Sequence, residues 1–179
     1  INNTFERVQK TSKNKKSVWT IYLRTLALTR SLGDPFSMAK AQEAFNMYPN
    51  DDNIFQLYRI LTYGQERITK ADKLSTEAKT LFGNGEFTKS AKLYLAAFDQ
   101  DPLQYTHSLN AALSLYNIKD LENAIKYFNI SNSSKNPAVI EKALRFKGLA
   151  LISKGDKKNG CAAFVQLFTK FPKRMYRQE

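Results

Sequence analysis

Cysteine and histidine are almost absent from this chain of 179 residues, which has one of each, Cys161 and His107. A single cysteine cannot form a disulfide within the chain, and this leaves the compartment open because many envelope proteins also lack disulfides. A lone histidine with no cysteine nearby lacks the partners that a metal site or a catalytic base needs. We therefore expect His107 to be structural and Cys161 to be a buried thiol at a small, packed position.

Long apolar runs and the common catalytic motifs are also missing. Without 18 consecutive apolar residues, no segment is expected to span a bilayer, so we expect a soluble domain on either side of a membrane. The sequence has no phosphate loop, no dinucleotide fingerprint and no nucleophile elbow, so we expect no enzyme, no cofactor, no metal and no small-molecule substrate. The acidic pairs Asp51–Asp52 and Asp99/Asp101 are interpreted as helix caps and loop acids.

Acidic residues are scarce relative to basic ones, with 16 Asp and Glu against 28 Lys and Arg, for a net charge of +12. Such a charge attracts anionic partners in general, including nucleic acid, an acidic membrane surface or an acidic peptide. The basic arm from Arg7 to Lys16 has no interleaved aromatic residues, so base stacking is not indicated and nucleic acid is disfavoured. The arm is interpreted as a solvated or membrane-proximal linker, which leaves contact with lipid phosphates open.

Helical periodicity is what the chain has in abundance. Apolar residues recur at helical spacing, and no segment shows the two-residue alternation of a strand. The sequence therefore predicts an all-α fold of about ten helices. The expected helices are a short lead helix or loose arm within 1–16, then 18–31, 35–47, 52–63, 66–83, 87–100, 103–117, 121–131, 138–154 and 157–170.

An internal repeat organises the second half of the chain. Gly85 precedes Pro102 by 17 residues, and Gly155 precedes Pro172 by the same spacing, while residues 120–137 supply a middle copy. A unit of about 34 residues cannot bury its apolar face alone and must stack on its neighbours. The repeat therefore predicts an extended superhelical surface, which is typical of a binding protein rather than an enzyme.

From about Ala71 the register resembles the tetratricopeptide repeat family, whose units carry small and aromatic residues at fixed positions before a terminal proline. Three positions depart from the pattern: Lys119 stands at the turn glycine, Lys157 replaces an aromatic residue, and the loop 131–137 is longer than usual. The first copy carries the pattern at Leu74, Ala78, Phe82, Gly85, Phe87, Ser90, Tyr94, Ala97 and Pro102.

The resemblance implies a right-handed superhelical array of antiparallel helix pairs, an α-solenoid. We expect a basic lead segment at 1–17, degenerate repeat-like helices at 18–70, three repeats at 71–172 and a basic tail at 173–179. In this family, ligands usually lie in a concave groove lined by the first helix of each repeat. The partner-binding residues implied by this register are Lys79, Phe82, Asn110, Leu113, Tyr116, Lys142, Arg145 and Leu149.

One subset of the family grips a terminal carboxylate with two lysines, two asparagines and an arginine. This chain matches that clamp at Asn110 and Lys142, whereas Ser75, Lys79 and Phe146 stand at the other three positions. An acidic or carboxylate-bearing peptide remains a softer hypothesis, because charge-assisted hydrogen bonds to lysine and arginine need no fixed motif.

The sequence thus predicts a non-catalytic scaffold that binds a peptide or protein partner in the groove. The resemblance leaves an alternative open: an accessory domain of a larger membrane-anchored envelope protein, such as a polysaccharide polymerase or ligase with its catalytic part upstream. The chain begins at Ile1 rather than at methionine, so we expect it to be a piece of a longer protein.

Overall fold

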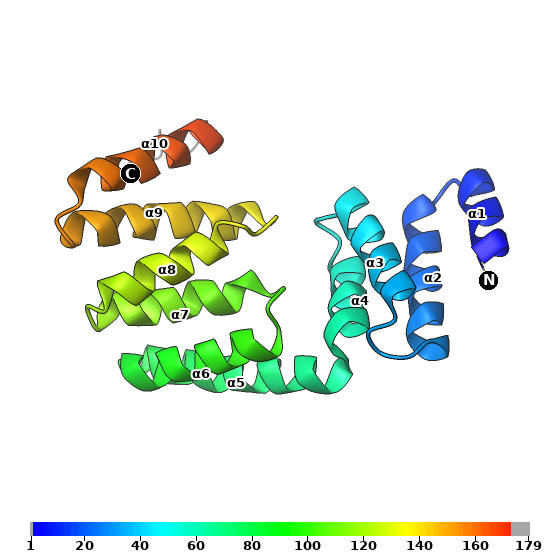
Figure 1. The fold of residues 1–179 in the computed structure, drawn as a ribbon, viewed down its shortest axis with the longest axis horizontal. Coiled ribbons are helices and arrows are strands. Elements are labelled where there is room, and N and C mark those ends of the chain that lie inside the picture. The colour runs from blue at the N-terminus through cyan, green and yellow to red at the C-terminus, as the bar shows by residue number, and fades with distance from the viewer. Residues whose placement is uncertain (1, 173–179) are drawn as a thin grey trace. The chain divides into compact units, whose positions relative to one another are not determined.

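The computed structural model describes residues 2–172. All the regular secondary structure assigned in that range is helical (Figure 1). This confirms the all-α prediction; the predicted basic tail, 173–179, lies outside the described residues. The α-helices are α1 (Asn2–Thr11), α2 (Lys15–Thr29), α3 (Pro35–Met47), α4 (Asp52–Tyr63), α5 (Gln65–Gly83), α6 (Phe87–Gln100), α7 (Tyr105–Asn117), α8 (Leu121–Ser131), α9 (Pro137–Ser153) and α10 (Lys157–Lys170).

Several helices have the predicted bounds, and capping explains where the others differ. The prediction holds for α3, α4, α6, α8 and α10, and the lead segment is a helix rather than a loose arm. Helix α2 begins three residues early because Asn14 caps it, accepting a hydrogen bond from the Ser17 N–H at 3.1 Å. Helix α7 begins late because the N–H of Gln104 closes a turn on the Asp101 carbonyl at 3.1 Å.

The described residues form two compact units, and the boundary between Thr69 and Lys70 falls inside α5. In the N-terminal unit, α2 packs against α1, α3 and α4, and α3 packs against α4. The lead helix contributes Phe5 to this core, where its ring stacks on Tyr22 at 3.8 Å and meets Trp19 edge-on at 4.7 Å. Part of the basic lead segment is therefore a packed helix.

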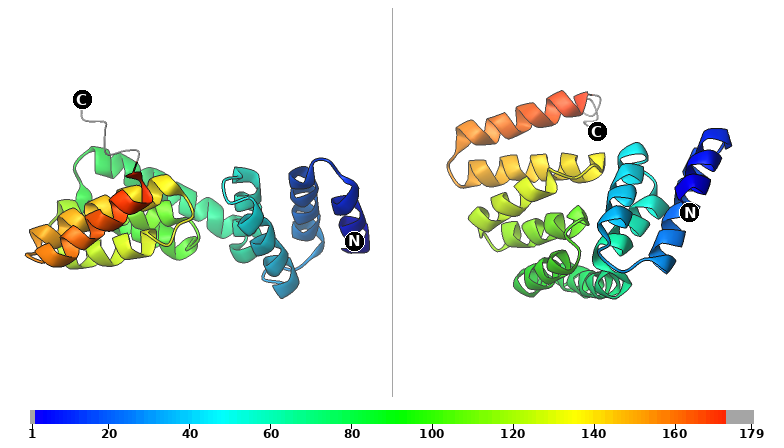
Figure 2. Two further views of the ribbon diagram at one scale, coloured as in Figure 1. Left: turned by 90° about the horizontal axis from the view of Figure 1, so that it is seen from above. Right: turned by 45° about the vertical axis from the view of Figure 1, so that its right-hand side comes forward.

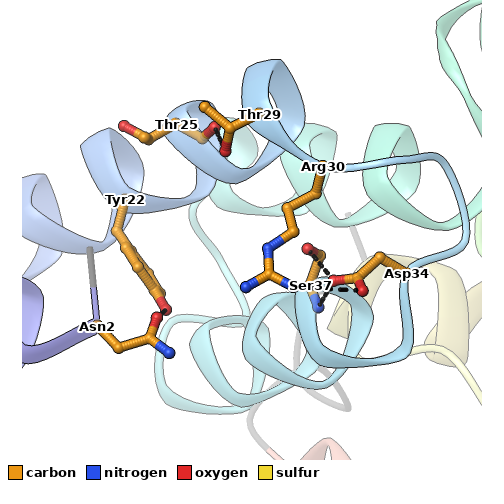
Figure 3. Close-up of polar contacts among 7 residues, drawn as sticks. All are labelled: Asn2, Tyr22, Thr25, Thr29, Arg30, Asp34 and Ser37. Atoms are coloured by element: carbon orange, nitrogen blue, oxygen red, sulfur yellow. Dashed lines mark hydrogen bonds and ion pairs between the residues drawn. The ribbon is translucent and has the colours of Figure 1, made fainter.

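Polar contacts reinforce the N-terminal unit (Figure 3). The Tyr22 hydroxyl donates to Asn2 Oδ1 at 2.7 Å and so ties α1 to α2. Asp34 caps α3, because its Oδ2 accepts from both the backbone N–H and the hydroxyl of Ser37, at 2.9 and 2.6 Å. These two hydrogen bonds lower the pKa of the Asp34 carboxyl, and Arg30, 3.6 Å away, lowers it further.

In the C-terminal unit, each helix from α6 to α10 packs on the next one in the chain, and α7 also contacts α9 (Figures 1 and 2). Helix α6 is tied to α5 by the Ser90 hydroxyl, which donates to the Ala78 carbonyl at 2.9 Å. Contact between α7 and α9 means that the first helices of successive pairs lie against each other. This arrangement is consistent with an α-helical repeat.

Two helix pairs of this unit share the same turn. Lys119 and Gly155 both have positive φ, at 65° and 94°, and each precedes an aspartate that caps the following helix. Each of these aspartates, Asp120 and Asp156, accepts from the backbone N–H and from the side-chain amide of the asparagine three residues further on. A shift of 36 residues therefore relates α7–α8 to α9–α10.

Candidate binding surface

The eight predicted partner-binding residues lie on the first helices of three successive pairs, α5, α7 and α9. Lys79, Lys142, Arg145 and Leu149 are exposed, whereas Phe82, Asn110 and Tyr116 are half-buried and Leu113 is buried. We use the name first-helix surface for the accessible residues Lys79, Phe82, Asn110, Tyr116, Lys142 and Phe146.

An aromatic pair joins α7 to α9 on this surface. The rings of Tyr116 and Phe146 meet edge-on with 6.0 Å between centroids, and both pack against the core while keeping part of their area accessible. A cation lies near each ring, with Lys119 Nζ 5.6 Å from the Tyr116 centroid and Arg145 5.1 Å from the Phe146 centroid. The pair offers a rigid apolar contact area edged by positive charge.

Leu113 is less accessible than a groove residue should be. Only 7% of it is exposed, and it belongs to a core cluster that also contains Val139 and Ala143 of α9. Helix α9 packs against α7 and covers this position. The register predicted from the sequence did not include this contact between helices. A partner would reach little of the Leu113 side chain.

Arg145 and Leu149 of α9 differ in burial from their equivalents in α7. With the 36-residue shift, they correspond to Leu109 and Leu113, which are both buried in the core. In α7 this helix side is covered, whereas in α9 it is exposed. The predicted groove residues Arg145 and Leu149 therefore occupy positions of α9 whose equivalents in α7 are covered by a neighbouring helix.

The lone histidine and the lone cysteine have opposite environments. His107 is only 4% exposed, at the start of α7, in keeping with the structural role expected for it. Cys161 is exposed, so the prediction of a buried thiol is wrong. It lies on the outward side of α10, while the small, packed positions of that helix are Gly160 and Ala163.

Sequence reasoning missed the apolar stripe to which Cys161 belongs. Phe164, Val165 and Phe168 share its side of α10, at the spacing that places residues on one helix face. The spacing was visible in the sequence, but the same spacing marks a stripe that faces the core. Only the packing of α10 distinguishes the two.

Two shallow depressions lie on the described residues, one in each unit. The depression in the C-terminal unit, about 510 Å³, lies between α8 and the end of α9, and Lys154 and Glu122 face each other across it at 3.8 Å. The other, about 420 Å³, is lined by the ends of α2 and α4 and the start of α5, including Arg30, Tyr63 and Arg67. Both are open and mixed in chemistry, and neither lies on the first-helix surface.

Several carboxylates that could suggest acid–base chemistry act as helix caps. Asp51 accepts from the N–H of Ile54 at 3.0 Å and pairs with Lys16 at 3.0 Å, and both interactions lower the pKa of its carboxyl. Asp156 accepts two hydrogen bonds from Asn159, which lower its pKa in the same way. These aspartates are ionised at neutral pH and fixed at helix starts.

Within residues 2–172, no group of three or more His, Cys, Asp or Glu side chains is placed to hold a metal ion. Among the same residues, none of the helices combines the length and the apolar composition that crossing a bilayer requires. No protein-family model matches the sequence, and no curated protein matches it either.

Proposed function

We propose that this chain is a non-catalytic binding module of the tetratricopeptide type, a right-handed array of helix pairs that holds an acidic peptide or protein segment on its first-helix surface. The observation that carries the proposal is the Tyr116–Phe146 pair, which spans α7 and α9 and is edged by cations. Such a surface joins two helices of successive pairs and depends on the array for its geometry.

The chemistry of this surface favours an extended acidic ligand. Half-buried aromatic rings supply apolar contact at low cost in side-chain entropy, and Asn110 of α7 adds a partly exposed amide that can donate and accept hydrogen bonds. Lys79 and Lys142 are exposed on α5 and α9, so a ligand that crosses α7 meets basic groups on the helices at both ends of its path. Charge-assisted hydrogen bonds to carboxylates would fix its register.

Charge reversal on the surface tests the proposal. Fluorescent acidic peptides, each with a free or an amidated C-terminus, are titrated against the protein and against the variant Lys79→Glu/Lys142→Glu. We expect the variant to lose at least tenfold in affinity, because two attractive contacts become repulsive. A preference for the free C-terminus would indicate recognition of a terminal carboxylate.

The matched control is Lys10→Glu/Lys13→Glu, which changes the net charge equally on the exposed basic arm. We expect this control to bind as the unmodified protein does, apart from a small uniform weakening at low salt. Equal losses in both variants would mean that the attraction comes from net charge alone, and the proposed surface would then be wrong. A Tyr116→Ala variant that binds normally would show that the Tyr116–Phe146 pair does not contribute to binding.

A further inference from the structure

Equivalent residues of α7–α8 and α9–α10 differ sharply in burial. Leu113 and Phe128 are 7% and 0% exposed and belong to the core cluster that includes Val139 of α9. Shifted by 36 residues, their equivalents are Leu149, which is 38% exposed, and Phe164, which is only partly buried. The outer side of α9–α10 thus has the apolar character of the surface that α9 covers on α7–α8.

The exposed apolar side of α10 continues this surface. Val165 is 63% exposed and Phe168 46%, and the rings of Phe164 and Phe168 are stacked with 6.4 Å between centroids. Helices α9 and α10 form the last layers at one end of the C-terminal unit (Figure 1). We call this surface the end face; its members are Leu149, Ile152, Cys161, Phe164, Val165 and Phe168.

The two helices that form the end face carry more basic than acidic residues. The only acidic residue within α9 and α10 is Glu141, against six basic residues in the same two helices. Arg145 is exposed where its equivalent, Leu109, is buried, and it lies one helical turn before Leu149 in α9. The basic residues of the two helices are Lys142, Arg145, Lys147, Lys157, Lys158 and Lys170.

We infer that the end face is a docking site for an amphipathic helix of a partner protein, one whose apolar stripe is flanked by acidic residues. Such a helix would lie on α9–α10 as α9 lies on α7–α8, and would bury Leu149 and Phe168 as α9 buries Leu113. The acidic residues flanking the apolar stripe of that helix would form ion pairs with Arg145 and the lysines of α10. None of the six end-face members belongs to the first-helix surface, and the site adds a second partner class to the proposed function.

A designed peptide tests this assignment. The probe has the sequence of α9, residues 137–153, with glutamate in place of Lys142, Arg145 and Lys147, so that it keeps the apolar residues that cover α7–α8. We expect the labelled peptide to bind the full chain in fluorescence anisotropy and to slow the alkylation of Cys161, the single cysteine. The unaltered basic α9 peptide is the matched probe and should bind at least tenfold more weakly.

Variants of the protein locate the site. Leu149→Asp and Phe168→Asp place a charge at exposed positions, and each should lower the affinity at least tenfold while circular dichroism shows an unchanged helix content. Lys79→Glu, on the first-helix surface, should bind the probe normally, so that failure here is distinguishable from failure of the proposed function.

Several results would overturn the assignment. They are absence of binding by the folded protein, equal binding by Phe168→Asp, equal binding of the acidic and basic peptides, and self-association that Phe168→Asp abolishes. Self-association of this kind would mean that a second copy of the chain covers the end face. Binding that appears only after residues 173–179 are removed would likewise assign the face to that segment rather than to a partner.

Discussion

The hydroxyl of Ser108 in α7 lies 2.8 Å from the hydroxyl of Ser131 in α8, and neither side chain is exposed to solvent. Each hydroxyl also lies within hydrogen-bond distance of a carbonyl of its own helix, Tyr105 O for Ser108 and Tyr127 O for Ser131. The two hydroxyls have only two hydrogens for these three contacts, which are the hydroxyl–hydroxyl contact and the two contacts with carbonyls. At any moment, one of the three therefore lacks a donated hydrogen. The contact joins the two helices at positions where larger side chains would hold them apart.

We expect Ser131→Ala to lower the free energy of unfolding by about 1 kcal/mol, because Ser108 keeps the Tyr105 carbonyl as an acceptor. Urea denaturation measures the change. Ser133→Ala, at an exposed position nearby, is the control and should be neutral. If both variants unfold at the same urea concentration as the unmodified protein, the contact between the hydroxyls contributes nothing to stability.

Close approach of α9 and α10 predicts a second stability effect. A Cβ atom on Gly160 would lie 2.6 Å from Ile152 Cγ1 and 3.1 Å from the carbonyl oxygen of Gly148, which is backbone and cannot rotate away. Gly160→Ala should therefore destabilise the protein by about 1–3 kcal/mol despite the better helix propensity of alanine. Gly83→Ala is the matched control, since nothing lies within 4 Å of its new methyl group.

The control Gly83→Ala should stabilise the protein by up to about 1 kcal/mol, because alanine loses less backbone entropy on folding than glycine does. Thermal or urea unfolding of the two variants gives the comparison. If Gly160→Ala raised stability as Gly83→Ala does, the helices would have to be farther apart at this crossing than the structure shows.

The left-handed turn at Lys119 predicts a stabilising substitution. Lys119 has φ of 65°, a conformation that costs an L-residue roughly 1–2 kcal/mol, whereas Gly155 serves the equivalent turn. Lys119→Gly removes this strain but adds unfolded-chain entropy and loses the contact of Lys119 with the Tyr116 ring. We expect a net gain of about 0.5 kcal/mol in the free energy of unfolding.

The reverse change, Gly155→Ala, should cost about 1 kcal/mol because it forces a side chain into the same conformation. Chemical denaturation of both variants measures the two effects. The two substitutions should change the free energy of unfolding in opposite directions. A loss of stability in Lys119→Gly would contradict the strain assigned to this turn.

The cap at Asp51 predicts a dependence of stability on pH. The N–H of Ile54 and, after it, the ammonium of Lys16 lower the pKa of Asp51 in the folded protein below its value in the unfolded chain. A group with a lowered folded-state pKa contributes stability above its unfolded pKa, so this contribution is present at neutral pH and is lost as the pH falls below about 4.

Asp51→Asn keeps a capping side chain but removes the charge. It should be less stable than the unmodified protein at about pH 7, and the difference should be smaller at about pH 3, below the usual pKa of an unfolded aspartate. Urea denaturation at the two pH values measures it, and added salt should reduce the part that Lys16 supplies. A difference that is constant across the pH range would show that the charge of Asp51 is not what stabilises the cap.

The sequence by itself determined the helices and their order, because the signals that begin and end a helix are local. Asp34 followed by Pro35, and the aspartates at 120 and 156, each satisfy backbone N–H groups within the next three residues, whatever lies farther away. The repeat spacing also predicted that successive helices would pack on one another, which the contacts from α6 to α10 bear out.

Only the tertiary structure decided which of these helix sides are surface. Leu113 and Leu149 are the same residue at equivalent positions, yet one is buried and the other 38% exposed, because α9 covers the first. Cys161 is exposed for the same reason, since its side of α10 lies outside the contact with α9. Burial depends on the neighbour that a helix acquires in three dimensions, and periodicity marks an apolar side without saying what covers it.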